Sequence, residues 1–271
     1  MRRKRNSVVN YVFGWIRKQS MKVKIFFAAT SLLFSLVALK LLVKDHSQFL
    51  IASELIHIAG IVVLVYKLTT KKTCSGLSLK SQELTAIFLA VRLVCSFMLE
   101  GDIHTLLDFA TLIFTTCLIF MIRYKLKSSY IKELDNFPIY YTVVPSAVLA
   151  VLIHPYNSHI YISQVLWAFC VYLEAVSVLP QLRMMQNAKM IEAFTAHYVF
   201  ALGVARFLAC AHWIIQVYET GGRYLFLVGA GYFWFPMVII AEIVQTFILA
   251  DFCYYYIKSV MQGQLIIRMP V

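Results

Sequence analysis

WAFCVYLEAVSVLPQL, residues 167–182, is the stretch on which the interpretation of this chain depends. It is apolar almost throughout, but it contains one carboxylate, Glu174, and ends in Leu179-Pro180-Gln181. A carboxylate inside such an apolar run is costly unless it faces a partner or a wet cavity. Pro180 removes a backbone donor and can break or kink a helix, and Gln181 can bond the freed backbone groups. The stretch therefore predicts either a kinked buried helix or a helix that lines a polar site inside a bundle.

The composition of the whole chain indicates a protein that crosses the membrane several times. Of its 271 residues, 61% are hydrophobic and 14% are charged, whereas a soluble domain has roughly 25% charged residues. The net charge of +12 does not indicate a nucleic-acid partner, because the Lys and Arg residues lie between apolar runs. The six cysteines are scattered without metal-site spacing, so reduced thiols and no metal are expected. No common catalytic or cofactor motif is present, so we expect neither an enzyme nor a cofactor.

Eight apolar runs have a length close to that of a membrane span. The first, residues 25–43, follows a tail at 1–24 that holds eight Lys and Arg residues and no acid. We expect an extra N-terminal membrane helix at 25–45, with an interfacial helix as the alternative. Seven further runs predict a core at 50–258, followed by a C-terminal tail at 259–271. These seven runs are residues 50–68, 79–99, 106–122, 137–153, 160–182, 194–217 and 235–257.

The charges of the connectors predict how the chain is threaded through the bilayer. Twelve Lys and Arg residues lie on one side of the predicted core, and one, Arg223, lies on the other. The positive-inside rule assigns the basic side to the cytosol. We therefore expect eight spans with both termini in the cytosol. The basic cluster at residues 2–5 is either a tail that sets this topology or an arginine-type sorting signal.

Two segments of the core resemble each other. Residues 81–94 read SQELTAIFLAVRLV, and residues 195–208 read TAHYVFALGVARFL. Each begins a helix with small polar residues and reaches an intramembrane arginine, Arg92 or Arg206, after three turns. Parallel three-helix repeats of this kind occur in transporter folds. We therefore predict an all-α polytopic membrane bundle, with a seven-helix core of two three-helix repeats plus one extra N-terminal helix.

Five ionisable side chains inside the apolar runs are the main candidates for function: His57, Arg92, Glu174, Arg206 and Asp251. Arginine stays protonated, so Arg92 and Arg206 need an anion nearby. Glu174 and Asp251 are the partners that the chain offers, and a ligand carboxylate is another. Two interpretations stay open, namely a set of internal ion pairs that holds the bundle and a cavity for an anionic ligand. Near Glu174, His57 would be suited to sense pH.

With these residues in view, the core resembles the ER lumen protein-retaining receptors, the family that retrieves proteins ending in KDEL or HDEL. The resemblance covers residues 54–263, with blocks in family order such as LIHIAGIVVLVYKL (55–68), CSGLSLKSQ (74–82) and VQTFILADFCYYYI (244–257). It implies seven helices in two repeats and residence in ER and Golgi membranes. It also implies vesicle-mediated transport, with C-terminal peptides of lumenal proteins and a vesicle coat as partners.

The resemblance implies roles for individual residues as well. His57 and Glu174 match the proton-sensing positions of the family, and Arg92 and Arg206 match arginines that bind the peptide carboxylate. The other matched positions belong to the lumenal pocket or to the last helix: Trp167, Trp213 and Asp251.

Several family residues are replaced in this chain. Leu50 stands in place of an arginine, Cys95 and Gln164 in place of acids, and Ala205 in place of the tyrosine that answers the histidine. Because partners for both ends of the peptide are missing, we expect HDEL binding roughly tenfold weaker or more. Because Ala205 lacks the hydroxyl that would take over from His57, we expect little gain on acidification. The tail at 259–271 lacks the lysine-rich pattern of the family, so residues 2–5 are the preferred sorting signal. The alternative is a small anionic solute transporter on the same fold.

Overall fold

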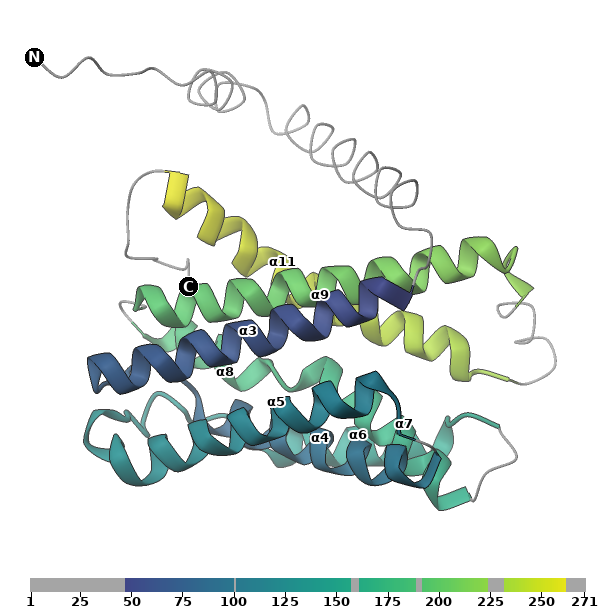
Figure 1. Ribbon diagram of the computed structural model, residues 1–271, viewed down its shortest axis with the longest axis horizontal. Helices are drawn as coiled ribbons and strands as arrows, with labels where there is room; N and C mark the ends of the chain where they lie inside the picture. The colour runs from purple at the N-terminus through teal and green to yellow at the C-terminus, as the bar shows by residue number, and fades with distance from the viewer. Residues whose placement is uncertain (1–46, 100, 157–160, 189–191, 224–231, 262–271) are drawn as a thin grey trace, which may run out of the picture. The chain divides into compact units, whose positions relative to one another are not determined.

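The computed structural model describes residues 47–99, 101–156, 161–188, 192–223 and 232–261. All regular secondary structure in these ranges is helical (Figure 1). The main helices are α3 (Ser47–Lys71), α4 (Leu79–Leu99), α5 (Ile103–Phe120), α6 (Tyr140–Leu152), α7 (Tyr161–Val176), α8 (Leu179–Asn187), α9 (Ala193–Glu219) and α11 (Trp234–Met261). Two short segments, Met121–Lys125 and Lys127–Ser129, follow α5. The tail at 1–24, the extra helix expected at 25–45 and residues 262–271 lie outside the described residues.

Each of the seven apolar runs expected in the core forms helix, which confirms a polytopic helical bundle. Among the described residues, five segments are long and apolar enough to cross a membrane: Gln48–Lys71, Ile103–Lys125, Tyr161–Asn187, Ala193–Glu219 and Trp234–Ser259. The helix α4 has 21 residues but is more polar, because it carries Lys80, Glu83 and Arg92. The helix α6 is shorter, at 13 residues.

The run at 160–182 is broken where its proline predicts a break. The helix α7 ends at Val176, and α8 begins at Leu179 with Pro180 in its first turn, where a missing N–H leaves no intrahelical bond unmade. The Gln181 side chain was expected to bond the backbone groups that Pro180 frees, and this was wrong, because it bonds the backbone of the connector between α3 and α4. Its Oε1 accepts from the Ser78 N–H at 2.8 Å, and its Nε2 donates to the Gly76 carbonyl at 2.8 Å. Gln181 thus ties α8 to the connector between α3 and α4.

This tie makes a prediction about stability. We expect Gln181→Leu to lower the free energy of unfolding by about 2 kcal/mol, because it leaves buried backbone groups of Gly76 and Ser78 without partners. Denaturant unfolding of the purified protein measures this difference. Gln186→Leu, at an exposed position of the same helix, is the matched control. Equal unfolding curves for the two variants would contradict the prediction.

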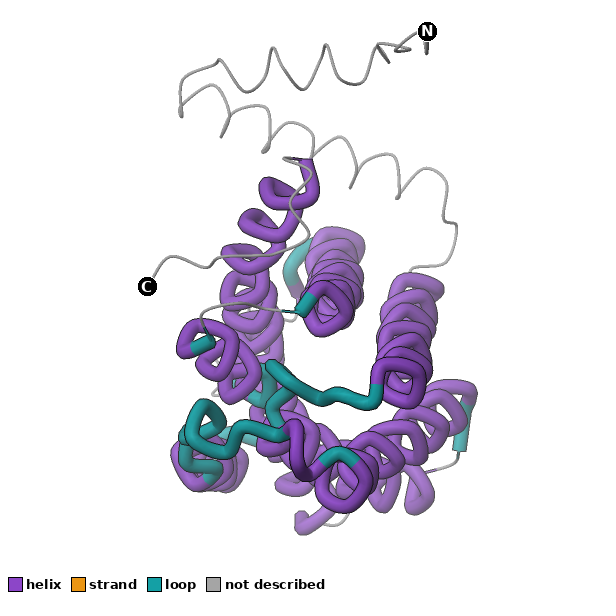
Figure 2. The backbone as a smooth tube through the Cα atoms, turned by 90° about the vertical axis from the view of Figure 1, so that its left-hand side faces the viewer, coloured by secondary structure: helices purple, strands orange, loops and turns teal. Residues whose placement is uncertain are grey.

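The helix contacts follow a two-fold pattern that agrees with the predicted repeats. The helix α3 contacts α5 and α9, and α4 contacts α5 and α7. In the second half, α7 contacts α11 and α4, and α9 contacts α11 and α3. Exchanging α3 with α7, α4 with α9 and α5 with α11 therefore maps this set of contacts onto itself. Figure 2 looks along the bundle and shows some of its helices end-on and others obliquely. The helix α6 joins the two halves along the chain and packs on α7.

The apolar core is divided into three clusters, and the largest of them lies in one half of the bundle. Its largest cluster takes residues from the C-terminal halves of α3 and α11, the end of α5, α8 and the start of α9, for example Ile61, Leu118, Met185, Val199 and Phe252. These segments adjoin the basic connectors, which the charge pattern assigns to the cytosol. The opposite halves of α3, α5 and α11 carry His57, Asp108 and Glu242, so the site lies toward the end predicted to be lumenal.

Candidate functional site

A cavity of about 420 Å³ lies in this polar half of the bundle. Its volume is within the range of pockets that bind small ligands. All six helices of the two repeats contribute to its wall. The polar and aromatic residues that line it are Ser53, Glu54, His57, Arg92, Ser96, Asp102, His104, Thr105, Asp108, Thr111, Trp167, Glu174, Arg206, Trp213, Trp234 and Glu242.

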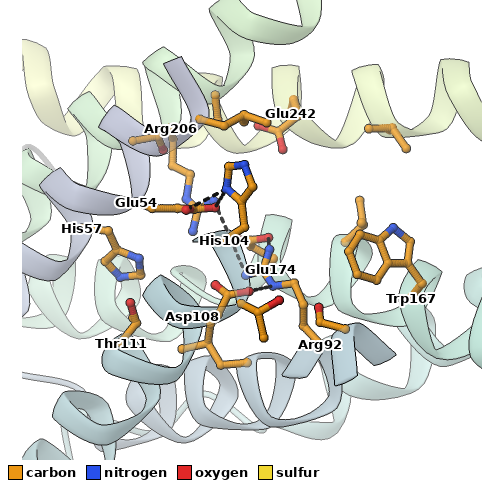
Figure 3. Close-up of a pocket in the computed structure, with 18 of the residues that line it drawn as sticks. Glu54, His57, Arg92, His104, Asp108, Thr111, Trp167, Glu174, Arg206 and Glu242 are labelled. Atoms are coloured by element: carbon orange, nitrogen blue, oxygen red, sulfur yellow. Dashed lines mark hydrogen bonds and ion pairs between the residues drawn. The ribbon is translucent and has the colours of Figure 1, made fainter. Parts of the chain in front are cut away.

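Glu174 is the centre of the charged cluster in this cavity (Figure 3). Arg92 Nη1 donates to Glu174 Oε2 at 3.0 Å, and Arg92 Nη2 donates to Oε1 at 3.3 Å. Arg206 Nη1 lies 2.5 Å from Glu174 Oε1. Glu174 and Arg206 are both buried, at 7% and 8% exposure. The two arginines therefore converge on one carboxylate, from the second helix of each repeat.

Asp108 of α5 is the second anionic partner of Arg92. Its Oδ2 lies 3.0 Å from Arg92 Nε, close enough for an ion pair but without the geometry of a hydrogen bond. Two carboxylates thus balance the two guanidiniums. The structure contains both an internal ion-pair network and a cavity, so the two interpretations left open by the sequence are not exclusive. A ligand carboxylate must compete with Glu174 or Asp108 for the arginines.

Glu54 and His104 form a second pair, between α3 and α5. His104 Nδ1 lies 2.9 Å from each carboxylate oxygen of Glu54. Sequence reasoning missed both His104 and Asp108 as site residues. The available signal was their spacing, because residues four apart lie on the same face of a helix.

Asp102 lines the cavity as the cap of α5. Its Oδ1 accepts hydrogen bonds from the backbone N–H of Thr105 at 3.0 Å and from the Thr105 hydroxyl at 3.1 Å. Burial acts to raise the pKa of Asp102, but the bonds from Thr105 outweigh it and hold the pKa below its usual range. Asp102 is thus satisfied as a helix cap.

The expected His57, Trp167 and Trp213 all line the cavity. His57 is buried, and its Nε2 makes no hydrogen bond within the described part of the chain. No hydrogen bond joins His57 to Glu174 there, because the arginines hold the carboxylate. Trp234 is an aromatic wall residue that sequence reasoning missed, and its ring lies 6.0 Å from that of Tyr172.

The structure does not bring Asp251 to the cavity. Asp251 lies at an exposed position of α11, nine residues after the cavity residue Glu242. At about 100° per residue, nine residues turn the helix by a half-turn more than two full turns, so the two acids face opposite ways. The expectation that Asp251 would be a partner of Arg92 or Arg206 was therefore wrong. Asp108 is instead the second carboxylate that pairs with Arg92.

The replaced family positions are divided between the cavity wall and the protein interior. Leu50 lines the cavity, so no cation stands at this point of the wall. Cys95 and Gln164 are buried but do not line the cavity. The Ala205 carbonyl accepts from the Ser53 hydroxyl at 2.7 Å, which joins α3 to α9.

Comparison with known proteins agrees with this architecture. A sequence model of the ER lumen protein retaining receptor family matches residues 73–216. The receptor erd-2.2 of Caenorhabditis elegans is 34% identical over 224 residues, which are 82% of this chain and 99% of the relative. The receptor of Petunia hybrida is 34% identical over 78% of this chain and 94% of its own length. Receptor 2 of Bos taurus is 32% identical over 80% and 96%.

Proteins of this family are retention receptors rather than enzymes. Their similarity extends over most of this chain, and the described part of the chain contains several helices fit to span a membrane. Together these findings identify a multi-pass protein of ER and Golgi membranes. The chain belongs to the ER lumen protein-retaining receptor family.

Proposed function

We propose that this chain binds C-terminal peptides of lumenal proteins in the cavity and acts in vesicle-mediated transport between the ER and the Golgi. The observation that carries the proposal is the convergence of Arg92 and Arg206 on one carboxylate, Glu174. The three residues lie in a cavity of about 420 Å³ that is also lined by tryptophans. Guanidinium groups in this arrangement suit a planar carboxylate. The terminal carboxylate of a peptide would bind Arg92 and Arg206, with Trp167 and Trp213 beside the peptide.

Peptide binding in this cavity requires an exchange of partners. Arg92 already has Glu174 and Asp108, and Arg206 has Glu174. A third carboxylate is accommodated when one internal acid moves away or takes up a proton. This exchange gives Glu174 a direct role in the pH response, and His57 lies in the same cavity wall.

We propose that the terminal carboxylate is held more weakly here than in a family member with the full set of arginines. Leu50 leaves two arginines to bind the peptide carboxylate, and both already pair with Glu174. The loss of one charge-assisted hydrogen bond corresponds to roughly ten- to a hundredfold in affinity. Contact with the vesicle coat would involve the ends of the chain, with residues 2–5 favoured over 259–271.

The proposal predicts that binding depends on the free C-terminus of the peptide. We expect purified protein to bind a peptide ending in HDEL, and amidation of its C-terminus to weaken binding by about tenfold or more. Isothermal titration at about pH 6, where histidine is mostly protonated, measures both affinities. Equal affinity for the acid and the amide would contradict the proposal.

Variants assign this dependence to the arginines. In Arg206→Gln the preference for the acid over the amide should fall, because the variant loses one of the two guanidiniums proposed to bind the carboxylate. Arg123→Gln is the matched control, since Arg123 is exposed and pairs with Glu83 away from the cavity. The control should keep the preference for the free carboxylate.

A further inference from the structure

Glu242 of α11 is a cavity carboxylate without a partner. Its Oε2 is buried and accepts no hydrogen bond, and no cation lies within ion-pair distance of it in the described part of the chain. The other four acids of the cavity wall each have partners. These are His104 for Glu54, Thr105 for Asp102, Arg92 for Asp108, and both arginines for Glu174.

We propose that Glu242 and the tryptophans of the cavity wall form a subsite for a positively charged group of the ligand. A buried carboxylate without a partner is strongly unfavourable, so it needs either a cation or a proton. The cavity has space for the cation. Figure 3 shows Glu242 reaching from α11 into the same space as Arg206 and His104.

The sequence of α11 builds one wall of this subsite. Trp234, Val238 and Glu242 follow one another at intervals of four residues, so they share one face of the helix. All three line the cavity, together with Trp167 of α7 and Trp213 of α9. Aromatic rings attract cations through their faces, most strongly in tryptophan. A cavity wall that combines this carboxylate with three tryptophans is therefore suited to an ammonium, imidazolium or guanidinium group.

The net charge of the cavity also favours a ligand that carries a cationic group. Its wall holds five carboxylates, two guanidiniums and two histidines, His57 and His104. The formal charge is −3 with both histidines neutral and −1 with both protonated. A ligand that carried only negative charge would be repelled. A ligand with a carboxylate for the arginines and a cation for Glu242 would satisfy both parts of the cavity.

This inference rests on the proposed function, which identifies the ligand as a peptide. It adds that Glu242 recognises a cationic residue of that peptide. The family acids replaced by Cys95 and Gln164 do not leave the cation without a partner, because Glu242 supplies a carboxylate from another helix. The chain would then select peptides with a basic residue near the C-terminus.

Peptides that differ in one charge test the subsite. We would compare N-acetylated KDEL with the same peptide carrying acetyl-lysine, each as free acid and as amide, on the full-length chain. We expect the lysine peptide to bind about ten- to a hundredfold more tightly than the acetyl-lysine peptide. In Glu242→Gln this preference should fall to about twofold or less, whereas the preference for the free acid should remain, since the arginines are intact.

Two further variants serve as references. Glu242→Asp keeps the charge and should retain part of the lysine preference, and Glu133→Gln removes an exposed acid outside the cavity and should change nothing. A lysine preference that persists in Glu242→Gln would overturn the assignment. So would equal binding of the two peptides by the unaltered chain, which is the result expected if Glu242 holds only a proton.

A probe without a carboxylate separates this inference from the proposed function. N-acetyl-lysinamide at millimolar concentration should raise the melting temperature of the unaltered chain but not that of Glu242→Gln. This shift without any peptide binding would support the cation subsite and reject the peptide receptor. Amide-sensitive peptide binding with no lysine preference and no shift would support the receptor and reject the subsite. The absence of both would reject both.

Discussion

Replacing Glu174 with Gln is expected to destabilise the protein by about 3–5 kcal/mol, the range for removing one partner of a buried ion pair. Glu174 is the only carboxylate within ion-pair distance of Arg206 among the described residues, and Arg206 is buried. The substitution leaves that guanidinium without a counter-charge. Denaturant unfolding of the purified protein measures the loss, and Glu133→Gln, at an exposed position outside the cavity, is the control.

Asp108→Asn provides a sharper comparison. Arg92 pairs with both Asp108 and Glu174, so it keeps a carboxylate when Asp108 is lost. We therefore expect a smaller destabilisation for Asp108→Asn than for Glu174→Gln. A larger effect of Asp108→Asn would show that Glu174 is not the centre of the network.

Acidification is expected to strengthen peptide binding. A peptide ending in HDEL brings more carboxylates than cations into a cavity that is already negative, so the complex holds protons more tightly than the protein alone. By linkage, affinity then rises as pH falls, by up to about tenfold per pH unit for each proton taken up. The charged and titratable groups that face one another here are Glu54, His57, Arg92, Asp102, His104, Asp108, Glu174, Arg206 and Glu242.

Titrations at about pH 6 and about pH 7.4, on either side of the range in which histidine titrates, measure this gain. His104→Gln should reduce it, because the variant removes the protonatable partner of Glu54. His197→Gln, at an exposed position of α9 outside the cavity, should leave it unchanged. An affinity that is independent of pH would contradict this prediction. It would instead support the sequence-based expectation of a weak pH response, which rested on Ala205 alone.

The difference between these two expectations comes from residues that the sequence did not bring together. The sequence-based expectation involves only Ala205 and one histidine, His57, because both match family positions. The pair of Glu54 with His104 joins helices whose relative rotation depends on packing. Such a pair is visible only when the helices are in place.

The sequence by itself determined the helices and their order. Apolar runs of membrane length, bounded by charged connectors, are local features, and each of the seven core runs forms helix. The break before α8 follows from Pro180, since proline acts on its own turn of the chain. The repeat was also readable, because Arg92 and Arg206 hold the same place in similar segments.

Only the tertiary structure decided which acids serve the cavity. Asp108, Glu242 and Asp251 are all isolated acids within apolar helices, and their local sequence does not say which side of the helix faces the cavity. Packing turns the first two toward the cavity and the third to the outside. The physical reason is that a helix offers every direction around its axis, and its neighbours determine which of those directions lies inside.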